Sequence, residues 1–223
     1  MLILGLETSG AMGSAALFED GAVLAEIGVT SKKNISVTLM PSVEFLFEQA
    51  RKIVNEVDYI AVSAGPGSFT GLRIGAAAAI GMAFAANKKL IAVPTQDAAA
   101  FNAGHAENAV IAVLTDARGA GVYAAFYESA NGGVKKMTDC FVAPIENVLT
   151  LLEAHGKNVI FFGDGAAKHQ TQILERKGFF IAPPQSLYPR AAGVAALAAR
   201  LTDTAVDYNS LKLNYIKSPQ TPQ

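Results

Sequence analysis

The residues with the clearest chemical potential lie in one glycine-rich segment, GPGSFTGLRIG, which spans residues 65–75. Gly65 and Gly67 allow a backbone with positive φ, while Pro66 fixes the bend between them. Ser68 or Thr70 can then cap a following helix. Because such a turn presents backbone N–H groups at the positive end of a helix, one interpretation is an anion or phosphate site.

A structural interpretation of the same segment stands beside the chemical one. The segment matches neither the GxxxxGK[ST] phosphate loop nor the GxGxxG fingerprint. Its glycines would then form a tight connector and let the helix pack closely on a strand. The residues alone leave both interpretations open.

Other reactive side chains stand alone in the sequence. The histidines His105, His155 and His169 fall singly near predicted helix ends or loops, where we expect ordinary surface or helix-end roles. Ser68 lies in no G-x-S-x-G elbow, so no serine triad is evident. Cys140 is the single cysteine, which excludes an intrachain disulfide, favours a reducing cytosol and cannot by itself anchor a metal cluster.

The composition is that of a weakly charged globular chain. Its 223 residues are about half apolar, enough for two lobes of roughly 100 residues each. A net charge of −1 and a pI near 6.3 argue against a broad electrostatic contact with nucleic acid. The N-terminal apolar run lacks a basic segment before it, which predicts a strand and not a signal peptide. The longest uncharged run, from Ile74 to Lys88, is shorter than the ~18 residues of a membrane span, so we expect a cytoplasmic protein with no membrane contact.

The first half of the sequence predicts strands and helices in a definite order. Three short apolar runs predict a meander with a turn at Asp20-Gly21, and Pro41 is expected in the first turn of the helix that follows. A buried strand then leads through the glycine-rich segment into a long helix, and another strand and helix complete the series. The expected strands are residues 2–7, 14–18, 23–29, 59–63 and 90–93, and the expected helices are 36–55, 69–86 and 95–105.

The second half loosely repeats this order. Two strands meet at a turn over residues 118–121, and residues 131–133 predict another hairpin. The expected strands are 110–115, 122–127 and 159–162, and the expected helices are 145–155, 166–177 and 191–200. The apolar pattern is interrupted over residues 104–109. We therefore predict two α/β lobes with mixed sheets, residues 1–105 and 106–223, with a C-terminal segment that can pack back on the first lobe.

A stripe of small residues follows the glycine-rich turn at three- and four-residue steps, which places it on one helix face and permits close approach of another helix. This face is either internal core or a docking surface for a relative or a second copy. As a docking surface it comprises Leu39, Met40, Val43, Phe47, Gly71, Leu72, Gly75, Ala79 and Met82. Gly75→Trp or Val43→Glu is then expected to prevent association while leaving the monomer folded.

Several blocks of the sequence resemble the bacterial TsaB (YeaZ) family, and together they cover nearly the whole chain. The most specific block is the segment 65–75 followed by Gly81. The other blocks are ILGLETS at 3–9 with GSAAL at 13–17, LMP at 39–41, DAR at 116–118 with VY at 122–123, GDGA at 163–166 and YPRA at 188–191. The chain departs from the family at Ile35, where a histidine is common.

The resemblance implies a two-lobed actin-like, sugar-kinase and Hsp70 (ASKHA) α/β fold. There the turn after the first strand and the hairpin around Asp116 correspond to phosphate-contacting turns, and Gly163 opens an adenosine-side turn. Acids at the first two positions hold Mg²⁺ in active relatives, because hard cations prefer oxygen ligands. A vestigial nucleotide site would comprise Glu7, Thr8, Ser9, Asp116, Gly163 and Gly165. The alternative, which we favour, makes Glu7 a solvent-facing carboxylate at a strand end and Asp116 a turn cap.

The resemblance also implies a function, because the family is the non-catalytic partner of the TsaD transferase. Such a subunit is required for threonylcarbamoylation of adenosine 37 in tRNAs that read codons starting with A. It would dock on TsaD as a heterodimer, act with a TsaE-type ATPase, meet tRNA only through the complex and require no cofactor. A homodimer in isolation is also expected.

The HxxxH metal pair of the catalytic relative is missing, since residues 34–39 read NISVTL. The alternative function is a self-sufficient ATP-dependent phosphotransferase or metallohydrolase of the same fold, which would bind ATP and Mg²⁺ on its own.

Overall fold

The computed structural model describes residues 1–30, 35–103, 109–119, 121–130 and 133–216. These residues form two compact units: residues 1–98 with 189–214, and residues 99–188 with the two residues that follow 214. Residues 189–214 thus belong to the same unit as the N-terminal strands. Most of the interruption expected at residues 104–109, including His105, lies outside the described residues.

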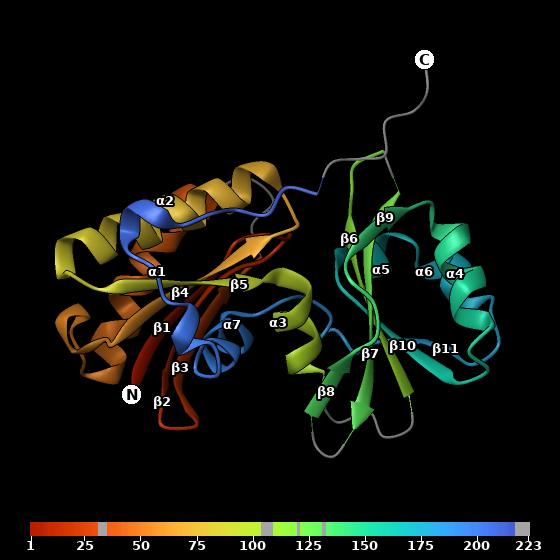
Figure 1. Ribbon diagram of the computed structural model, residues 1–223, viewed down its shortest axis with the longest axis horizontal. Coiled ribbons are helices and arrows are strands. Elements are labelled where there is room, and N and C mark those ends of the chain that lie inside the picture. Colours follow the sequence, from red (N-terminus) through yellow and green to blue (C-terminus); the bar gives the residue numbers. More distant parts are fainter. Residues whose placement is uncertain (31–34, 104–108, 120, 131–132, 217–223) are drawn as a thin grey trace. The chain divides into compact units, whose positions relative to one another are not determined.

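The first unit contains a five-stranded mixed sheet in the order β3-β2-β1-β4-β5 (Figure 1). Its strands are β1 (Leu2–Glu7), β2 (Gly13–Glu19), β3 (Ala22–Val29), β4 (Tyr59–Gly65) and β5 (Lys89–Pro94). The first three form the predicted antiparallel meander, and β4 and β5 add in parallel beyond β1. Asp20 and Gly21 form the predicted turn, both with positive φ (47° and 93°).

Helices cover both faces of this sheet because alternate residues of β1 point in opposite directions. Leu4 and its neighbours at two-residue spacing pack with α1 and α2, whereas Ile3 packs with α7 on the other face. Gly5 lets α7 approach, since a Cβ there would lie 2.5 Å from the Ala191 carbonyl oxygen. The helices of this unit are α1 (Ile35–Ala50), α2 (Phe69–Ala86), the start of α3 (Thr95–Asn102) and α7 (Ala191–Ala198), with short 3₁₀ turns η1 (Val54–Glu56), η2 (Thr202–Thr204) and η3 (Tyr208–Ser210).

Two expectations for α1 were wrong. The helix ends at Ala50 and not near residue 55, because Arg51 adopts a left-handed conformation (φ 52°) that breaks the helical hydrogen-bond series. Pro41 lies in the second turn and not the first. Its ring deprives the Val37 carbonyl of the usual N–H donor, and Val37 is exposed, so water can supply a hydrogen bond there.

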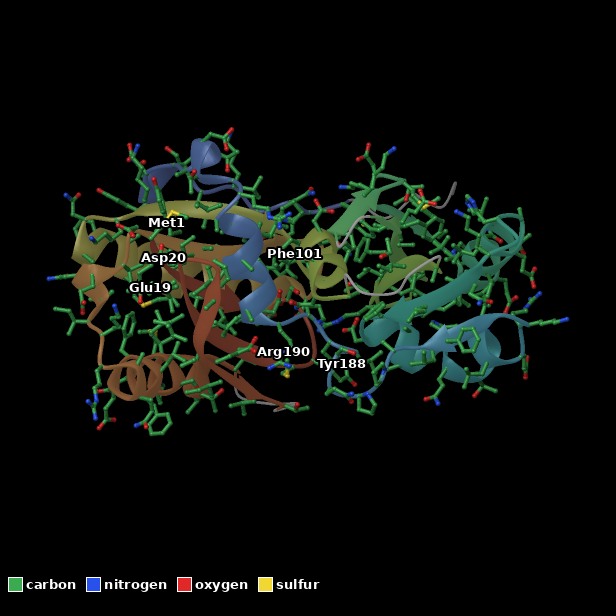
Figure 2. All side chains as sticks on the ribbon, turned by 90° about the horizontal axis from the view of Figure 1, so that it is seen from below. Met1, Glu19, Asp20, Phe101, Tyr188 and Arg190 are labelled. Atoms are coloured by element: carbon green, nitrogen blue, oxygen red, sulfur yellow. The ribbon has the colours of Figure 1, made fainter. Side chains whose placement is uncertain are left out.

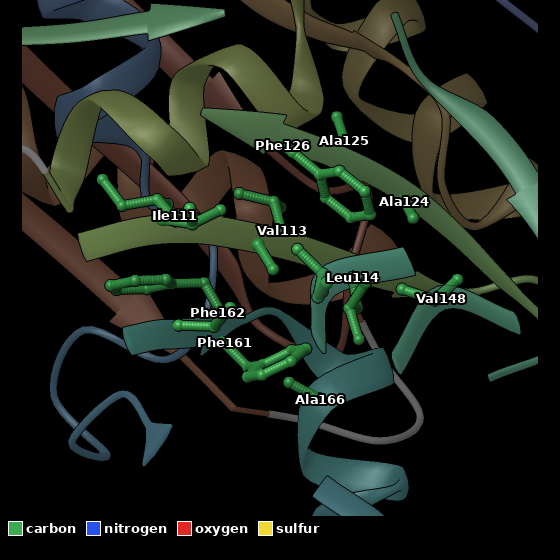
Figure 3. Packing of buried hydrophobic residues seen from close by; sticks show 14 of the residues in the cluster. Ile111, Val113, Leu114, Ala124, Ala125, Phe126, Val148, Phe161, Phe162 and Ala166 are labelled. Carbon is green, nitrogen blue, oxygen red and sulfur yellow. The ribbon is translucent and has the colours of Figure 1, made fainter. Parts of the chain in front are cut away.

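The second unit repeats the strand order of the first. Its sheet runs β11-β10-β6-β7-β8, with β9 paired to β7; β6 and β7 are antiparallel, and β10 lies parallel to β6. The strands are β6 (Ala109–Asp116), β7 (Val122–Ala130), β8 (Gly133–Lys136), β9 (Phe141–Ala143), β10 (Asn158–Phe162) and β11 (Phe179–Ile181), and the helices are α4 (Ile145–Glu153), α5 (Asp164–Lys168) and α6 (Gln170–Leu174). Figure 3 shows side chains of β6, β7, β10, α4 and α5 meeting in its core.

The helix expected over residues 166–177 is in fact two short helices. His169 leaves helical geometry (φ −105°, ψ 23°) and separates α5 from α6. Asp164 starts α5 earlier than expected, directly after Gly163. This early start places Asp164 and Lys168 on the same side of one helical turn.

Helix α2 is longer than the uncharged run suggested. It has 18 residues, and among the described residues it is the helix with the length and apolar composition of a membrane span. Its inner side packs on β4, through residues such as Leu72, Ala79 and Ala83. A third of this 18-residue window is buried, so the helix is partly covered by its own unit.

The returning segment is anchored to the first sheet at the start of α7. Glu26 of β3 accepts a hydrogen bond from the Ala192 N–H (3.0 Å) and forms an ion pair with Arg190. Ser14 of β2 accepts one from the Ala191 N–H (2.9 Å). Figure 2 labels Arg190 at this position. Two strands therefore supply the acceptors that the first N–H groups of α7 require.

Replacement of Glu26 tests this anchor. We expect Glu26→Ala to lower the free energy of unfolding by about 1–2 kcal/mol, because it removes both the acceptor for Ala192 and the partner of Arg190. Urea unfolding measures the change. Glu44→Ala on the exposed side of α1 is the control and should stay close to the unaltered protein; equal losses in both variants would contradict the anchor.

Candidate functional site

The glycine-rich segment seats α2 on the turn that follows β1. A Cβ at Gly67 would lie 2.7 Å from Ser9, and a Cβ at Gly71 or Gly75 would overlap the Thr8 carbonyl oxygen or hydroxyl, respectively. These glycines are needed because the turn and the helix approach too closely for any side chain between them. The structural interpretation of the segment therefore accounts for its glycines.

Hydrogen bonds fasten the same contact. The Ser68 N–H donates to the Ser9 carbonyl (2.7 Å), and the Thr8 hydroxyl donates to the Gly71 carbonyl (2.8 Å). Ser68 is the predicted N-cap, since its hydroxyl accepts from the Gly71 N–H (3.3 Å). Two N–H groups that an anion would need at this helix start are thus already bonded within the chain.

The Glu7 side chain also points toward the turn formed by Thr8 and Ser9. Its Oε1 accepts hydrogen bonds from the N–H and the hydroxyl of Ser9, both at 2.5 Å, and the residue is fully buried. The expectation that Glu7 faces solvent was therefore wrong: the short Glu7-Thr8-Ser9 turn folds back and supplies its own donors. A buried carboxylate held in this way does not fit a solvated Mg²⁺ that binds through water.

The C-terminal segment closes the end of β4. The Asn214 N–H donates to the Ala64 carbonyl (2.7 Å), and the Asn214 carbonyl lies where a Cβ of Gly65 would be. Gly65 has a positive φ of 108° and donates its N–H to Thr95 (3.2 Å). In open α/β sheets ligands bind beyond the carboxyl ends of the strands. In the first unit, the chain itself occupies this position beside β4.

The second unit has an acidic turn at the end of β6. Asp116 accepts hydrogen bonds on Oδ1 from the Arg118 N–H (3.0 Å) and from the Lys168 ammonium (2.8 Å). Its own N–H donates to Asp164 Oδ1 (3.0 Å). The expectation that Asp116 caps its turn is confirmed. Asp164 was not among the predicted site residues, although it lies between two that were.

The two acids differ in their proton affinity. Partial burial opposes ionisation of Asp116, but hydrogen bonds from Lys168 and the Arg118 N–H outweigh it and hold the pKa of Asp116 below its ordinary value. Burial raises the pKa of Asp164, and the negative charge of Asp116 adds to this effect, against the hydrogen bond from the Asp116 N–H. Asp116 is thus the stable anion of the pair.

Two glycines without side chains allow α5 to pack directly against the backbone of β6 next to this turn. Gly163 has a positive φ of 96°, and a Cβ on it would overlap the Leu114 carbonyl. A Cβ on Gly165 would lie 2.9 Å from the same carbonyl. The predicted residues Asp116, Gly163 and Gly165 are therefore neighbours within the second unit, just as Glu7, Thr8 and Ser9 are within the first.

The reactive residues that the structure describes lie apart from one another. His155 is exposed beyond α4, and His169 contacts Gln172 (2.7 Å) between α5 and α6. Cys140 is partly buried beside the second core. Ile35, at the family's histidine position, lies over Gly13 of β2. Among the described residues no three His, Cys, Asp or Glu side chains gather as a metal site would require.

Most residues of the predicted docking surface lie inside the first unit. The buried ones are Leu39, Val43, Gly71, Leu72, Gly75 and Ala79, whereas Met40 is exposed and Phe47 and Met82 are partly so. The expectation that Gly75→Trp leaves the monomer folded was therefore wrong, because Thr8 occupies the space beside Gly75. Val43→Glu would likewise place a charge in the core.

Glycine substitutions test the seat of α2. We expect Gly71→Ala to lower the free energy of unfolding by about 1–3 kcal/mol or more, since its Cβ would displace Thr8. Gly81 lies on the same helix with no atom within 4 Å of a Cβ there, so Gly81→Ala should raise stability by about 0.5–1 kcal/mol. Thermal unfolding of both variants measures the contrast, and similar shifts would contradict the seat.

Asp164→Asn tests the assignment of charge in the acidic turn. The amide oxygen can still accept from the Asp116 N–H, but no charge remains on this partly buried side chain. Because the folded protein raises the pKa of Asp164, the cost of ionising it appears as the pH rises above the ordinary aspartate pKa of about 3.9. The variant should therefore be more stable than the unaltered protein at pH 7, with the advantage fading below about pH 4.

Urea unfolding at several pH values measures this difference. Asp203→Asn, in an exposed 3₁₀ turn, is the matched control. A loss of stability at pH 7 specific to Asp164→Asn would show that the folded chain favours the charged form.

Comparisons with known proteins agree with this geometry. A family model described as TsaD, tRNA N6-adenosine threonylcarbamoyltransferase, matches residues 23–223. The tRNA threonylcarbamoyladenosine biosynthesis protein TsaB of Bacillus subtilis is 31% identical, with 97% of this chain and 94% of the relative covered.

Solved structures give the same picture. YeaZ from Pseudomonas aeruginosa superimposes with a TM-score of 0.81 at 26% identity, covering 96% of this chain and 99% of the other. An ADPNP-bound activator of 2-hydroxyisocaproyl-CoA dehydratase from Clostridium difficile (TM-score 0.52, 11% identity, 97% and 100% covered) shows the ASKHA-type fold alone. This chain therefore belongs to the TsaB (YeaZ) family of tRNA threonylcarbamoyladenosine biosynthesis proteins, which is related to TsaD.

Proposed function

We propose that this chain is a non-catalytic interaction subunit of a threonylcarbamoyl transferase complex. It docks on the TsaD transferase as a heterodimer and activates it together with a TsaE-type ATPase, in the cytoplasm. The target is adenosine 37 of tRNAs that read codons starting with A, and the chain meets that tRNA only through the complex. It needs no cofactor of its own.

The observation that most supports this proposal is the outer side of α1 and α2. Large apolar side chains are exposed there, namely Val37, Met40, Phe45, Phe69 and Phe84. A globular chain gains nothing in isolation from apolar side chains in water, and such faces are typical of protein interfaces. Phe84 packs edge-on against Tyr208 of the C-terminal segment, which covers part of the face.

The alternative, an ATP-dependent enzyme, has less support. The turn after β1 is filled by the chain's own helix, and Asp116 is already neutralised by Lys168. ATP and Mg²⁺ titrations of the purified chain separate the two hypotheses. Tight binding with turnover by the isolated chain would refute a pure interaction role.

Outward-facing residues test the docking surface. We expect Met40→Glu and Phe45→Glu to weaken binding to TsaD by about tenfold or more while the melting temperature hardly changes, because a charge at these exposed positions is desolvated only in the complex. Leu174→Glu is the matched control, since Leu174 is equally apolar and about half exposed on α6 of the other unit.

Size-exclusion chromatography with light scattering gives the readout. Undiminished co-elution of Met40→Glu with TsaD would place the interface elsewhere. The same variants at several concentrations of the chain alone test the proposed homodimer, which uses the same face and should dissociate with them.

A further inference from the structure

The acidic turn of the second unit contains a cation supplied by the chain. The Lys168 ammonium lies 2.8 Å from Asp116 Oδ1, and both side chains are partly open to solvent. Asp116 lies at the end of β6, one of the two positions where the family resemblance implies an acid that holds Mg²⁺ in active relatives. Here the carboxylate has a positive partner 52 residues away in the sequence.

Two residues of α5 form hydrogen bonds with Asp116, one with its backbone and one with its side chain. Asp164, at the start of the turn, accepts the Asp116 N–H, while Lys168, four residues later, donates to its carboxylate. The Arg118 N–H donates to the same oxygen. The backbone and the side chain of one residue are thus fixed by a single helical turn.

The position of Lys168 is determined by packing. Gly163 and Gly165 bring α5 into contact with the backbone of Leu114, two residues before Asp116. Ala166 is fully buried in the same helix and holds it on the core. The backbone of Lys168 is therefore held in place by the packing of α5, and its flexible side chain extends to the carboxylate of Asp116.

We propose that Lys168 is a built-in counter-ion that takes the place of a divalent cation at the Asp116 turn, so that this turn is ordered without metal or nucleotide. A divalent ion would have to displace the Lys168 ammonium from Asp116 and bind beside the partly buried Asp164. Removing the positive charge leaves two neighbouring carboxylates, the kind of oxygen ligands that Mg²⁺ and Mn²⁺ prefer. The inference does not depend on whether the chain docks on a transferase.

Paramagnetic Mn²⁺ titration of the ¹⁵N-labelled full-length chain tests the proposal. In Lys168→Met we expect the amide signals of Asp116, Arg118 and Asp164 to broaden at about a tenfold lower Mn²⁺ concentration than in the unaltered chain. Excess Mg²⁺ should reverse the broadening. Lys168→Arg retains the charge and should behave like the unaltered chain.

Controls separate charge from position. Lys177→Met removes one positive charge from the exposed surface of the same unit and should leave the Mn²⁺ response unchanged. Equal broadening in the unaltered chain and Lys168→Met would overturn the proposal, and so would a folded Lys168→Met that does not respond at all. Lys168→Gln repeats the test if the methionine variant does not give the native spectrum.

Discussion

The close contact between the start of α2 and the Thr8–Ser9 turn is the constraint on which the first unit depends. It exists only because residues 67, 71 and 75 have no side chains. The contact fixes the direction of α2, which then covers β4 with its small inner residues. It also fills space beyond the carboxyl end of the first strand, the end of an open α/β sheet at which ligands bind. One packing requirement thus explains both the sequence of the segment and the closed turn.

The second unit also has a helix that packs closely on a strand end, at the place that corresponds to the start of α2. Its strand order matches that of the first, so β10 lies beside β6 as β4 lies beside β1. At the end of β10, Gly163 and Gly165 again let a helix approach the neighbouring strand. The two turns differ in how charge is compensated: Glu7 is buried among donors of its own loop, whereas Asp116 relies on Lys168.

Local patterns predicted what depends on neighbours in the sequence. The β1 to β3 meander, the Ser68 cap and the pairing of β6 with β7 follow from apolar periodicity and turn residues. The three-residue strands β9 and β11 are too short for such a pattern. Contacts between distant residues, such as Glu26 with Arg190 or Asp116 with Lys168, have no signature in spacing at all. Burial of Glu7 was missed for the same reason.

The small-residue stripe of α2 shows why spacing alone cannot distinguish a face that packs in the core from a docking surface. Residues four positions apart lie on the same face of a helix. In α2, residues 71, 75, 79 and 83 form the face that packs on the sheet of their own unit. A face that is already covered cannot also receive a partner. Phe69 and Phe84 are exposed on α2, so they are the apolar side chains of this helix that the proposed interaction could use. The small buried residues explain how α2 packs tightly on its own sheet, and the large exposed apolar residues are the part of the helix that this packing leaves unexplained.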